Sequence, residues 1–395
     1  MNNFTFHVST DIRFGKERLG ELPDVLNTFG KNVLLVYGGG SIKKNGLYDT
    51  IMAQLTANHN KVTELSGVDP NPRIETVGEG AQLCRDNHID VILAVGGGSV
   101  IDCSKVIAGA ACSELAPWDL VLNRSYQGPA IPLVTILTLA ATGSEMNRGA
   151  VISNLTTKQK LGVHGPHFLP QVSFLDPTTT FSVSRYQTAA GSADIMSHLI
   201  ENYFSATPQT DVQDGVAEGL LKAVIKNLPI ALDTPDDYDA RANLMWASTL
   251  ALNGLTGSGK GGAWSCHPME HELSAFYDIT HGVGLAILTP RWMLHVLNEE
   301  TAPKLARFAR EVFGVQESVL EMAARMGIQK LYDFFASCGI PMTLPEVGIK
   351  DDQHFEEMAK QAVAFSSISK QAYVPLSVDD VIAIYQDAQT PSNYL

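Results

Sequence analysis

The chain has 395 residues, of which 45% are hydrophobic and 18% are charged. That length suits two or three domains, and the composition excludes a disordered or low-complexity chain. A formal net charge of -14 argues against nucleic acid and an anionic membrane surface as partners, because both call for a basic face.

The first half of the chain alternates short apolar runs with helical patterns. Two runs, Asn32 to Tyr37 and Asp90 to Val95, each end in Gly-Gly-Gly-Ser and lead into a predicted helix. Further strands are expected at 61–65, 129–136, 150–154 and 172–175, and helices at 42–55, 73–87 and 100–111. Short apolar strands separated by helices indicate a parallel sheet with helices on both faces.

Beyond about residue 180 the pattern is helical almost to the end. The predicted helices cover 185–204, 212–230, 238–253, 266–276, 281–296, 303–313, 318–335 and 378–388. The sequence therefore predicts an α/β domain over 1–180 and an all-helical domain over 181–395. Because no Gly/Ser linker separates them, we expect the two domains to pack together with a cleft between them.

The two Gly-Gly-Gly-Ser turns suit a bound nucleotide. Glycine lets a phosphate approach the backbone, and a helix start offers unpaired N–H groups with a partial positive charge. An ordinary tight turn also needs glycine, but two such turns at successive strand ends favour a dinucleotide site. The hydroxyl-rich loop Thr138 to Glu145 could contact phosphate or nicotinamide, or could be an ordinary loop. Glu64 and Asp69 both have the spacing of a ribose-binding carboxylate, and neither is decisive.

A set of histidines and one aspartate has the spacing of a metal site. Asp194 and His198 are four residues apart in a predicted helix, so their side chains share a face. His267 and His271 repeat that spacing, and His281 follows after a short break. Borderline divalent metals bind this mixture of carboxylate and imidazole. A lone histidine on a helix is more often a surface or hydrogen-bonded residue, but the two spaced pairs favour a metal.

Two other kinds of site find little support. His271 and Glu272 begin an HExxH motif, but Ala275 stands where a zinc peptidase has its second histidine. The five cysteines are scattered, which argues against a disulfide frame and a thiolate zinc site and fits a reducing compartment. The N-terminal segment lacks the apolar stretch of a secretory signal, and no apolar run reaches the roughly 18 residues of a membrane span. We therefore expect a cytoplasmic protein.

Several segments together resemble the iron-containing (group III) alcohol dehydrogenases, most closely the butanol dehydrogenase or broad-range aldehyde reductase branch. The matching segments cover nearly the whole chain and are FGK at 14–16, YGGGSIKKNG at 37–46, GVDPNP at 67–72, AVGGGSVID at 94–102, TLAATGSEMN at 138–147, VISNLTTKQK at 151–160, DIMSHLIENY at 194–203, ANLMWASTLALNGL at 242–255 and HPMEHELSAFYDITHG at 267–282. The second GGGSxxD and the spacing of the three histidines are specific. The resemblance implies an N-terminal Rossmann-like parallel sheet domain and a C-terminal all-α domain, the dehydroquinate synthase-like fold.

The resemblance also implies the residues of the site. One divalent metal, Fe2+ or Zn2+, would be held by Asp194, His198, His267 and His281. His271 would lie near the substrate as a candidate for proton relay.

On the cofactor side, the resemblance places the pyrophosphate at Gly97, Gly98 and Ser99, close to Asp102. Residues implied near the nicotinamide and its ribose are Thr138, Leu139, Thr142, Asn147 and Lys160. Asn71 would lie near the adenosine.

The choice between NAD and NADP depends on the first glycine-rich turn. Many NAD-preferring members of the wider family have an aspartate where Gly38 stands, and its carboxylate would repel a 2′-phosphate. The turn is uncharged here and consists of Gly38, Gly39, Gly40 and Ser41. Because Lys43 and Lys44 follow it, we expect NADP(H) to be preferred, with NAD(H) as the alternative.

The implied activity is reversible hydride transfer between NAD(P)H and short- to medium-chain aldehydes such as butanal, giving primary alcohols. A sugar-phosphate lyase of the dehydroquinate synthase type shares the fold, but it needs several basic residues around its substrate. Here Lys260 and Arg291 are the nearest basic residues to the histidines in sequence. A non-catalytic scaffold is disfavoured by the complete ligand set and both turns. The resemblance also implies a homodimer, which could form by edge pairing of residues 5–8.

Overall fold

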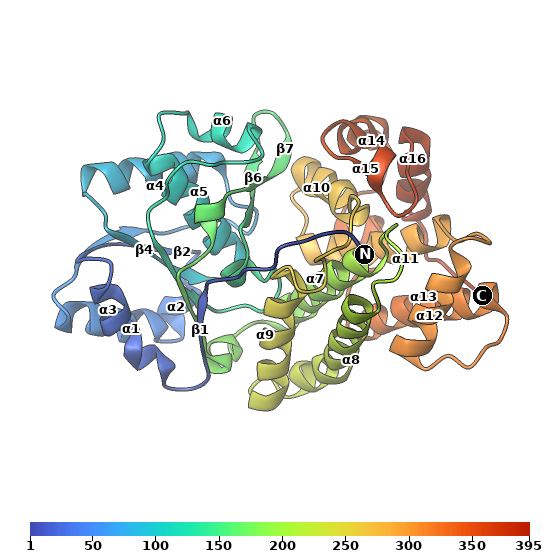
Figure 1. Ribbon diagram of the computed structural model, residues 1–395, viewed down its shortest axis with the longest axis horizontal. Helices are drawn as coiled ribbons and strands as arrows, with labels where there is room; N and C mark the ends of the chain where they lie inside the picture. The colour runs from blue at the N-terminus through green and yellow to red at the C-terminus, as the bar shows by residue number, and fades with distance from the viewer. The chain divides into compact units, whose positions relative to one another are not determined.

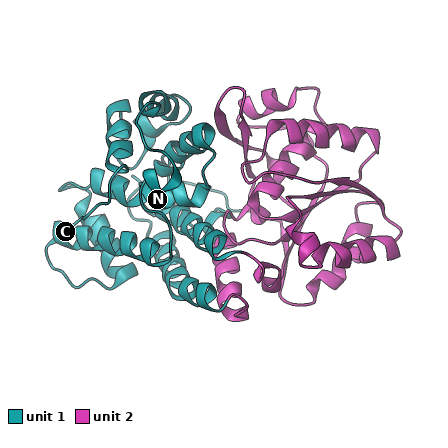
Figure 2. Cartoon of the chain, turned by 180° about the vertical axis from the view of Figure 1, so that it is seen from behind, with its two compact units in different colours: residues 1–6, 184–234, 250–395 teal, residues 7–183, 235–249 magenta.

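The computed structural model describes residues 1–395 and divides them into two compact units (Figure 2). The α/β unit consists of residues 7–183 and 235–249, and the helical unit consists of residues 1–6, 184–234 and 250–395. Two short segments therefore belong to the unit that lies further away in the sequence. Hydrogen bonds account for this: the Asn2 amide donates to the Gly259 carbonyl at 2.8 Å, and the Thr249 hydroxyl donates to Glu145 at 2.5 Å.

A six-stranded sheet forms the centre of the α/β unit (Figure 1). Its order is β1-β8-β5-β4-β2-β3, and every neighbouring pair of strands is parallel. The strands are β1 (Asp11–Phe14), β2 (Asn32–Tyr37), β3 (Lys61–Leu65), β4 (Val91–Gly96), β5 (Leu133–Leu137) and β8 (Val172–Leu175). The predicted Rossmann-like sheet is confirmed.

The central strands send their side chains alternately into two apolar cores, one on each face of the sheet. In β4, Ile92 and Ala94 belong to one core, whereas Leu93 and Val95 belong to the other. The helices of the α/β half are α1 (Leu22–Asn27), α2 (Ser41–Lys44), α3 (Leu47–Ala57), α4 (Ile74–Asp86), α5 (Gly98–Ala111) and α6 (Pro117–Leu122). Residues of α4, α5 and α6 complete the first core, and residues of α1 and α3 complete the second. Because both faces are covered, these strands are apolar at successive positions.

Three strands differ from the sequence-based expectations. β6 (Gly149–Asn154), expected as a further strand, pairs with the unexpected β7 (Gln159–His164) in a separate antiparallel hairpin. The edge of the main sheet is β1, which was not expected either. Residues 5–8 form no strand, so the edge strand expected there is wrong for this chain.

The helical unit is organised around α7 (Arg185–Tyr203), whose residues are buried along most of its length. Helices α8 and α11 pack against α7. The helices of the second half after α7 are α8 (Asp211–Asp233), α9 (Tyr238–Leu252), α10 (Cys266–Tyr277), α11 (His281–His295), α12 (Ala302–Phe313), α13 (Leu320–Ser337), α14 (Phe355–Ala364), α15 (Ile368–Gln371) and α16 (Val378–Asp387). The predicted all-helical half is confirmed, and α14 and α15 add two helices that the pattern did not indicate.

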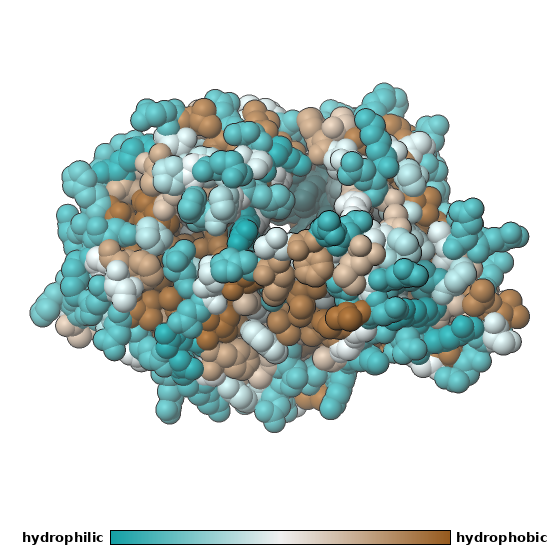
Figure 3. Space-filling view, viewed as in Figure 1, coloured by the Kyte–Doolittle hydropathy of each residue, from teal (hydrophilic) through white to brown (hydrophobic).

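Short 3-10 turns connect several elements. They are η1 (Arg18–Glu21), η2 (Ser144–Met146), η3 (Pro166–Phe168), η4 (Pro177–Thr180) and η5 (Pro345–Val347). None of the helices combines the length and the apolar composition that crossing a bilayer requires. On the face shown in Figure 3, hydrophilic residues cover much of the surface and apolar residues are interspersed among them.

Candidate active site

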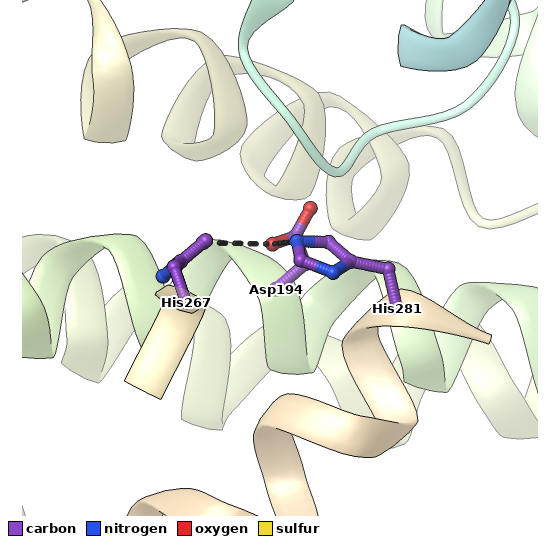
Figure 4. A group of neighbouring side chains, drawn as sticks. All are labelled: Asp194, His267 and His281. Atoms are coloured by element: carbon purple, nitrogen blue, oxygen red, sulfur yellow. Dashed lines mark ion pairs between the residues drawn. The ribbon is translucent and has the colours of Figure 1, made fainter. Parts of the chain in front are cut away.

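Three helices of the helical unit bring one carboxylate and three imidazoles together; we call Asp194, His198, His267 and His281 the Asp194 cluster. Asp194 and His198 come from α7, His267 from the first turn of α10, and His281 from the first residue of α11. Asp194 Oδ1 lies 3.6 Å from His198 Nε2, 3.8 Å from His267 Nε2 and 3.7 Å from His281 Nε2. Figure 4 shows Asp194 between His267 and His281. Segments far apart in the chain therefore meet at one carboxylate oxygen.

The spacing of these atoms fits a single metal ion. Donor atoms bound at 2.0–2.2 Å around a tetrahedral centre are about 3.3–3.6 Å apart, close to the separations observed here. The ligand atoms of Asp194, His267 and His281 all lie within 4.8 Å of one another. Asp194 Oδ1 and His267 Nε2 are buried, and neither has a hydrogen-bond partner. Because buried polar atoms rarely stay unpaired, these orphaned atoms are best explained by a cation between them.

Burial and charge set the protonation of the cluster. Burial by itself raises the pKa of Asp194, but the charge interactions with the three imidazoles outweigh it and hold that pKa well below its ordinary value. Burial lowers the pKa of His198 to about 3. Burial also opposes the charged form of His267, but the carboxylates of Asp194 and Glu201 raise its pKa to about 9. The cluster thus offers an ionised carboxylate and, at His198, a neutral imidazole, which are the forms that bind metals.

Other polar residues surround the cluster. His271 lies one turn after His267 on α10, and its ring centroid is 6.2 Å from that of His267 and 5.6 Å from that of His281. Its assignment to proton relay stays a prediction. The sequence analysis overlooked two buried carboxylates, Glu201 and Glu270, which contact His267 and His281. Their only signal in the sequence is their position beside the histidines on otherwise apolar helices.

In the α/β unit, the second glycine-rich turn meets the loop after β5. A Cβ atom added to Gly98 would lie 2.8 Å from Thr142 Cβ and closer still to the threonine hydroxyl. A Cβ added to Gly97 would lie 3.1 Å from Leu139 Cβ. Both loops follow neighbouring parallel strands, and ligands of open α/β sheets bind outside the carboxyl ends of the strands. The structure therefore brings these four predicted cofactor residues together.

A buried network fastens this loop to α5. Asp102 Oδ1 accepts a hydrogen bond from the Ser144 hydroxyl at 2.5 Å, and Oδ2 accepts one from the Val151 amide at 2.9 Å. Lys105, which the sequence analysis did not single out, donates to Ser144 Oγ at 2.8 Å, Asn147 Oδ1 at 3.0 Å and the Gly149 carbonyl at 2.8 Å.

Burial lowers the pKa of Lys105 to about 8, while the carboxylates of Asp102 and Glu145 favour its charged form. Within the predicted cofactor set, Asp102 and Asn147 thus help to hold the loop in place.

The first glycine-rich turn is more open. No atom lies within 4 Å of a Cβ built on Gly39 or Gly40, and Gly40 has φ 96°, a conformation that favours glycine. Ser41 then begins the short helix α2. Lys43 Nζ lies 4.5 Å from the ring centroid of Tyr48.

A carboxylate also lies beside this turn. Glu64 accepts hydrogen bonds from the hydroxyls of Tyr37, at 2.7 Å, and Tyr48, at 2.9 Å. Lys43 Nζ lies 5.1 Å from the Tyr37 ring as well. Of the two acidic candidates for the ribose, Glu64 is therefore the one tied to the end of β2, whereas Asp69 pairs with Arg73 at 3.6 Å.

The remaining predicted cofactor residues lie in the same unit. The Thr138 amide donates to the Gly96 carbonyl at 3.0 Å, and the Ser99 hydroxyl donates to the Pro70 carbonyl. Asn71 and Lys160 are buried. Contact of any of these residues with a nucleotide stays a prediction.

Two family models match the two halves of the chain. The model described as iron-containing alcohol dehydrogenase matches residues 9–177. The model described as the C-terminal part of the Fe-containing alcohol dehydrogenase family matches residues 188–389.

Relatives match along the full length. The chain is 50% identical over 387 residues to NADH-dependent butanol dehydrogenase A of Clostridium acetobutylicum, with 98% of this chain and 99% of the relative covered. It is 38% identical over 352 residues to the NADPH-dependent aldehyde reductase YqhD of Escherichia coli, with 88% and 90% covered. The crystal structure of NADH-dependent butanol dehydrogenase A from Thermotoga maritima has a TM-score of 0.93 and 36% identity, with 99% of both chains covered.

Proposed function

The chain belongs to the iron-containing alcohol dehydrogenase family, and from this premise we propose that it is an alcohol dehydrogenase and aldehyde reductase. It transfers hydride reversibly between NAD(P)H and short- to medium-chain aldehydes such as butanal, giving primary alcohols. The observation that carries the proposal is the meeting of Asp194, His198, His267 and His281 at one buried oxygen. These four residues hold one divalent metal, for which the family makes Fe2+ the expected ion and Zn2+ the alternative.

The residues of the helical unit have separate tasks in this proposal. A bound cation would polarise the aldehyde oxygen and stabilise the negative charge that grows on it as hydride arrives at the carbon. Asp194 supplies an anionic ligand, and the imidazoles supply neutral ones. His271 donates the proton that the product hydroxyl needs, and it accepts that proton back in the direction of alcohol oxidation.

The residues of the α/β unit bind the nicotinamide cofactor. Gly97, Gly98 and Ser99 bind the pyrophosphate at the start of α5, where backbone N–H groups and the helix dipole favour an anion. Thr138, Leu139, Thr142, Asn147 and Lys160 border the nicotinamide and its ribose, and Asn71 lies on the adenosine side.

NADPH is the preferred cofactor in this proposal. The support is the uncharged, open turn of Gly38, Gly39, Gly40 and Ser41, with two lysines directly after it. Lys43 lies over the same two tyrosine rings whose hydroxyls bind Glu64, which offsets the charge of that carboxylate. Relatives carry both names, since one is called NADH-dependent and another NADPH-dependent. A kcat/KM for NADH at least tenfold above that for NADPH would overturn this preference.

The central experiment is the His267→Ala variant. We expect it to lose the metal, measured by elemental analysis, and to lose NADPH-dependent reduction of butanal, followed at 340 nm. Its affinity for NADPH, measured by nucleotide fluorescence, should stay close to that of the unaltered protein, because the predicted nucleotide residues lie in the other unit. Full turnover by a metal-free His267→Ala protein would refute the ligand assignment.

Two further properties complete the proposal. A homodimer is expected, and light scattering during size-exclusion chromatography tests it directly. A cytoplasmic location is supported by the five cysteines, all of which are free thiols in the structure.

A further inference from the structure

The three imidazoles of the Asp194 cluster have unequal support. His267 and His281 each have a buried carboxylate at Nδ1, on the opposite side of the ring from Asp194. His198 Nδ1, in contrast, is buried and has no hydrogen-bond partner. The four predicted ligands are therefore not equivalent before any ion arrives.

Glu201 holds both the ring and the backbone of His267. Its Oε1 lies 3.1 Å from His267 Nδ1 and accepts the His267 amide at 2.8 Å, and its Oε2 accepts the Ser265 amide at 2.6 Å. Ser265 precedes α10 and caps it with no side-chain hydrogen bond of its own. Glu201, on α7, thus satisfies amides at the start of α10 that would otherwise lack acceptors. A single carboxylate fixes where α10 begins and how its histidine is turned.

Glu270 holds His281 in a comparable way. Its Oε2 contacts His281 Nδ1, and its Oε1 accepts the Ser274 hydroxyl at 2.5 Å. The Glu270 side chain is fully buried, and the absence of a side chain at Gly284 makes room for it. A Cβ at Gly284 would lie only 2.8 Å from Glu270 Cγ. Because α11 begins at His281, this contact also joins α10 to the start of α11.

A carboxylate at Nδ1 changes what the ring offers to a metal. It keeps the proton on Nδ1, so the lone pair stays on Nε2, which here faces Asp194. It also prevents rotation of the ring and raises the basicity of the ligand, and loss of such a partner typically costs 10–100-fold in metal affinity. His198 has neither benefit. Its ring is placed only by packing, 4.7 Å from the His267 ring and 5.6 Å from the Trp264 ring, centroid to centroid.

We propose that Glu201 and Glu270 are positioning residues that make Asp194, His267 and His281 the tight part of the metal site, and that His198 is its weakly held fourth ligand. This inference rests on the proposed ligand set. It adds an order of affinity among those ligands and assigns two carboxylates that do not touch the metal.

The test measures zinc affinity, with a competing chromophoric chelator, on the full-length protein. Glu201→Gln and Glu270→Gln keep the shape of the side chain and one acceptor oxygen, and each should weaken zinc binding about 10–100-fold. Glu272→Gln is the matched control, because Glu272 is a buried glutamate on α10 that the cluster does not include, and its zinc affinity should match the unaltered protein. NADPH affinity, measured in the same preparations, should be unchanged.

The order of the ligands is tested with alanine variants. His198→Ala should still bind one zinc per chain at saturating zinc, with a weaker dissociation constant. Asp194→Ala and His267→Ala should not bind zinc at the site. If Asp194→Ala and His267→Ala keep their zinc, the proposed ligand set itself fails.

If those two variants lose zinc while both glutamine variants bind it as tightly as the control, only the positioning inference fails. An equal loss in His198→Ala and His267→Ala would overturn the order of affinity. Glu270→Gln gives an independent result, because Glu270, unlike Glu201, is not bound to the amides at the start of α10.

Discussion

Replacing Gly282 with alanine should damage the metal site through the backbone alone. Gly282 follows His281 in the first turn of α11, where α11 crosses α7. A Cβ there would lie 2.7 Å from the carbonyl carbon of Ala190 and closer still to its oxygen. Ala190 precedes Asp194 by one helical turn, so the clash falls between the elements that carry two of the predicted ligands. The obstructing atoms are backbone, which cannot turn aside as a side chain can.

The size of the effect follows from that distance. Ordinary carbon contacts begin near 3.4 Å, so the start of α11 has to retreat by roughly 0.7 Å or more. Metal sites tolerate about 0.2 Å in ligand distances, so His281 would leave the range in which it binds the ion. Overpacking of this kind costs about 1–3 kcal/mol, of which the better helix propensity of alanine returns up to about 1 kcal/mol. We therefore expect a modest loss of stability and a large loss of metal.

The assay compares zinc affinity, butanal reduction and thermal unfolding of Gly282→Ala with those of Gly219→Ala. Gly219 lies on the exposed side of α8, and no atom lies within 4 Å of the position that a Cβ would take there, so the control adds the same methyl group to a helix without a clash. Gly282→Ala should bind zinc at least tenfold more weakly and turn over about 100-fold more slowly, as expected for a misplacement near 1 Å. Zinc affinity within threefold of the control, together with full turnover, would refute the reasoning.

Three other perturbations test separate parts of the structure. Lys105→Met leaves its buried acceptors without a donor, so it should lower the unfolding free energy by about 2–4 kcal/mol and weaken NADPH binding in fluorescence titrations, with zinc content unchanged. Gly98→Ala should raise the KM for NADPH at least tenfold, because its Cβ would lie 2.8 Å from Thr142 Cβ, and an unchanged KM would contradict the close approach of the two loops. Burial, with Glu270 and Glu357 adding to it, raises the pKa of Glu272 to about 8, so the folded protein retains a proton that the unfolded chain releases near pH 4.5. Stability should therefore fall as the pH rises from about 5 to 8, by no more than about 5 kcal/mol, and chemical denaturation of Glu272→Gln should show a flatter pH dependence.

The features that the sequence determined by itself are those with a strong local signal. β2 and β4 are continuous apolar runs because both faces of the sheet are buried, and each is followed by glycines that a helix start needs. The spacing of Asp194 and His198 places both side chains on one face of α7 whatever surrounds that helix. Such patterns predicted the two kinds of fold in the two halves and the residues of the Asp194 cluster.

Only the tertiary structure decided the features that depend on which elements meet. β7 is a short, mixed segment that becomes a strand by pairing with β6. Glu201 looks like an ordinary helical glutamate until α10 begins beside it, and Gly282 has no distinguishing signal until α11 crosses the backbone of α7. The physical reason is that hydrogen-bond partners and close backbone contacts join residues far apart in the chain, and no local pattern of residues records them.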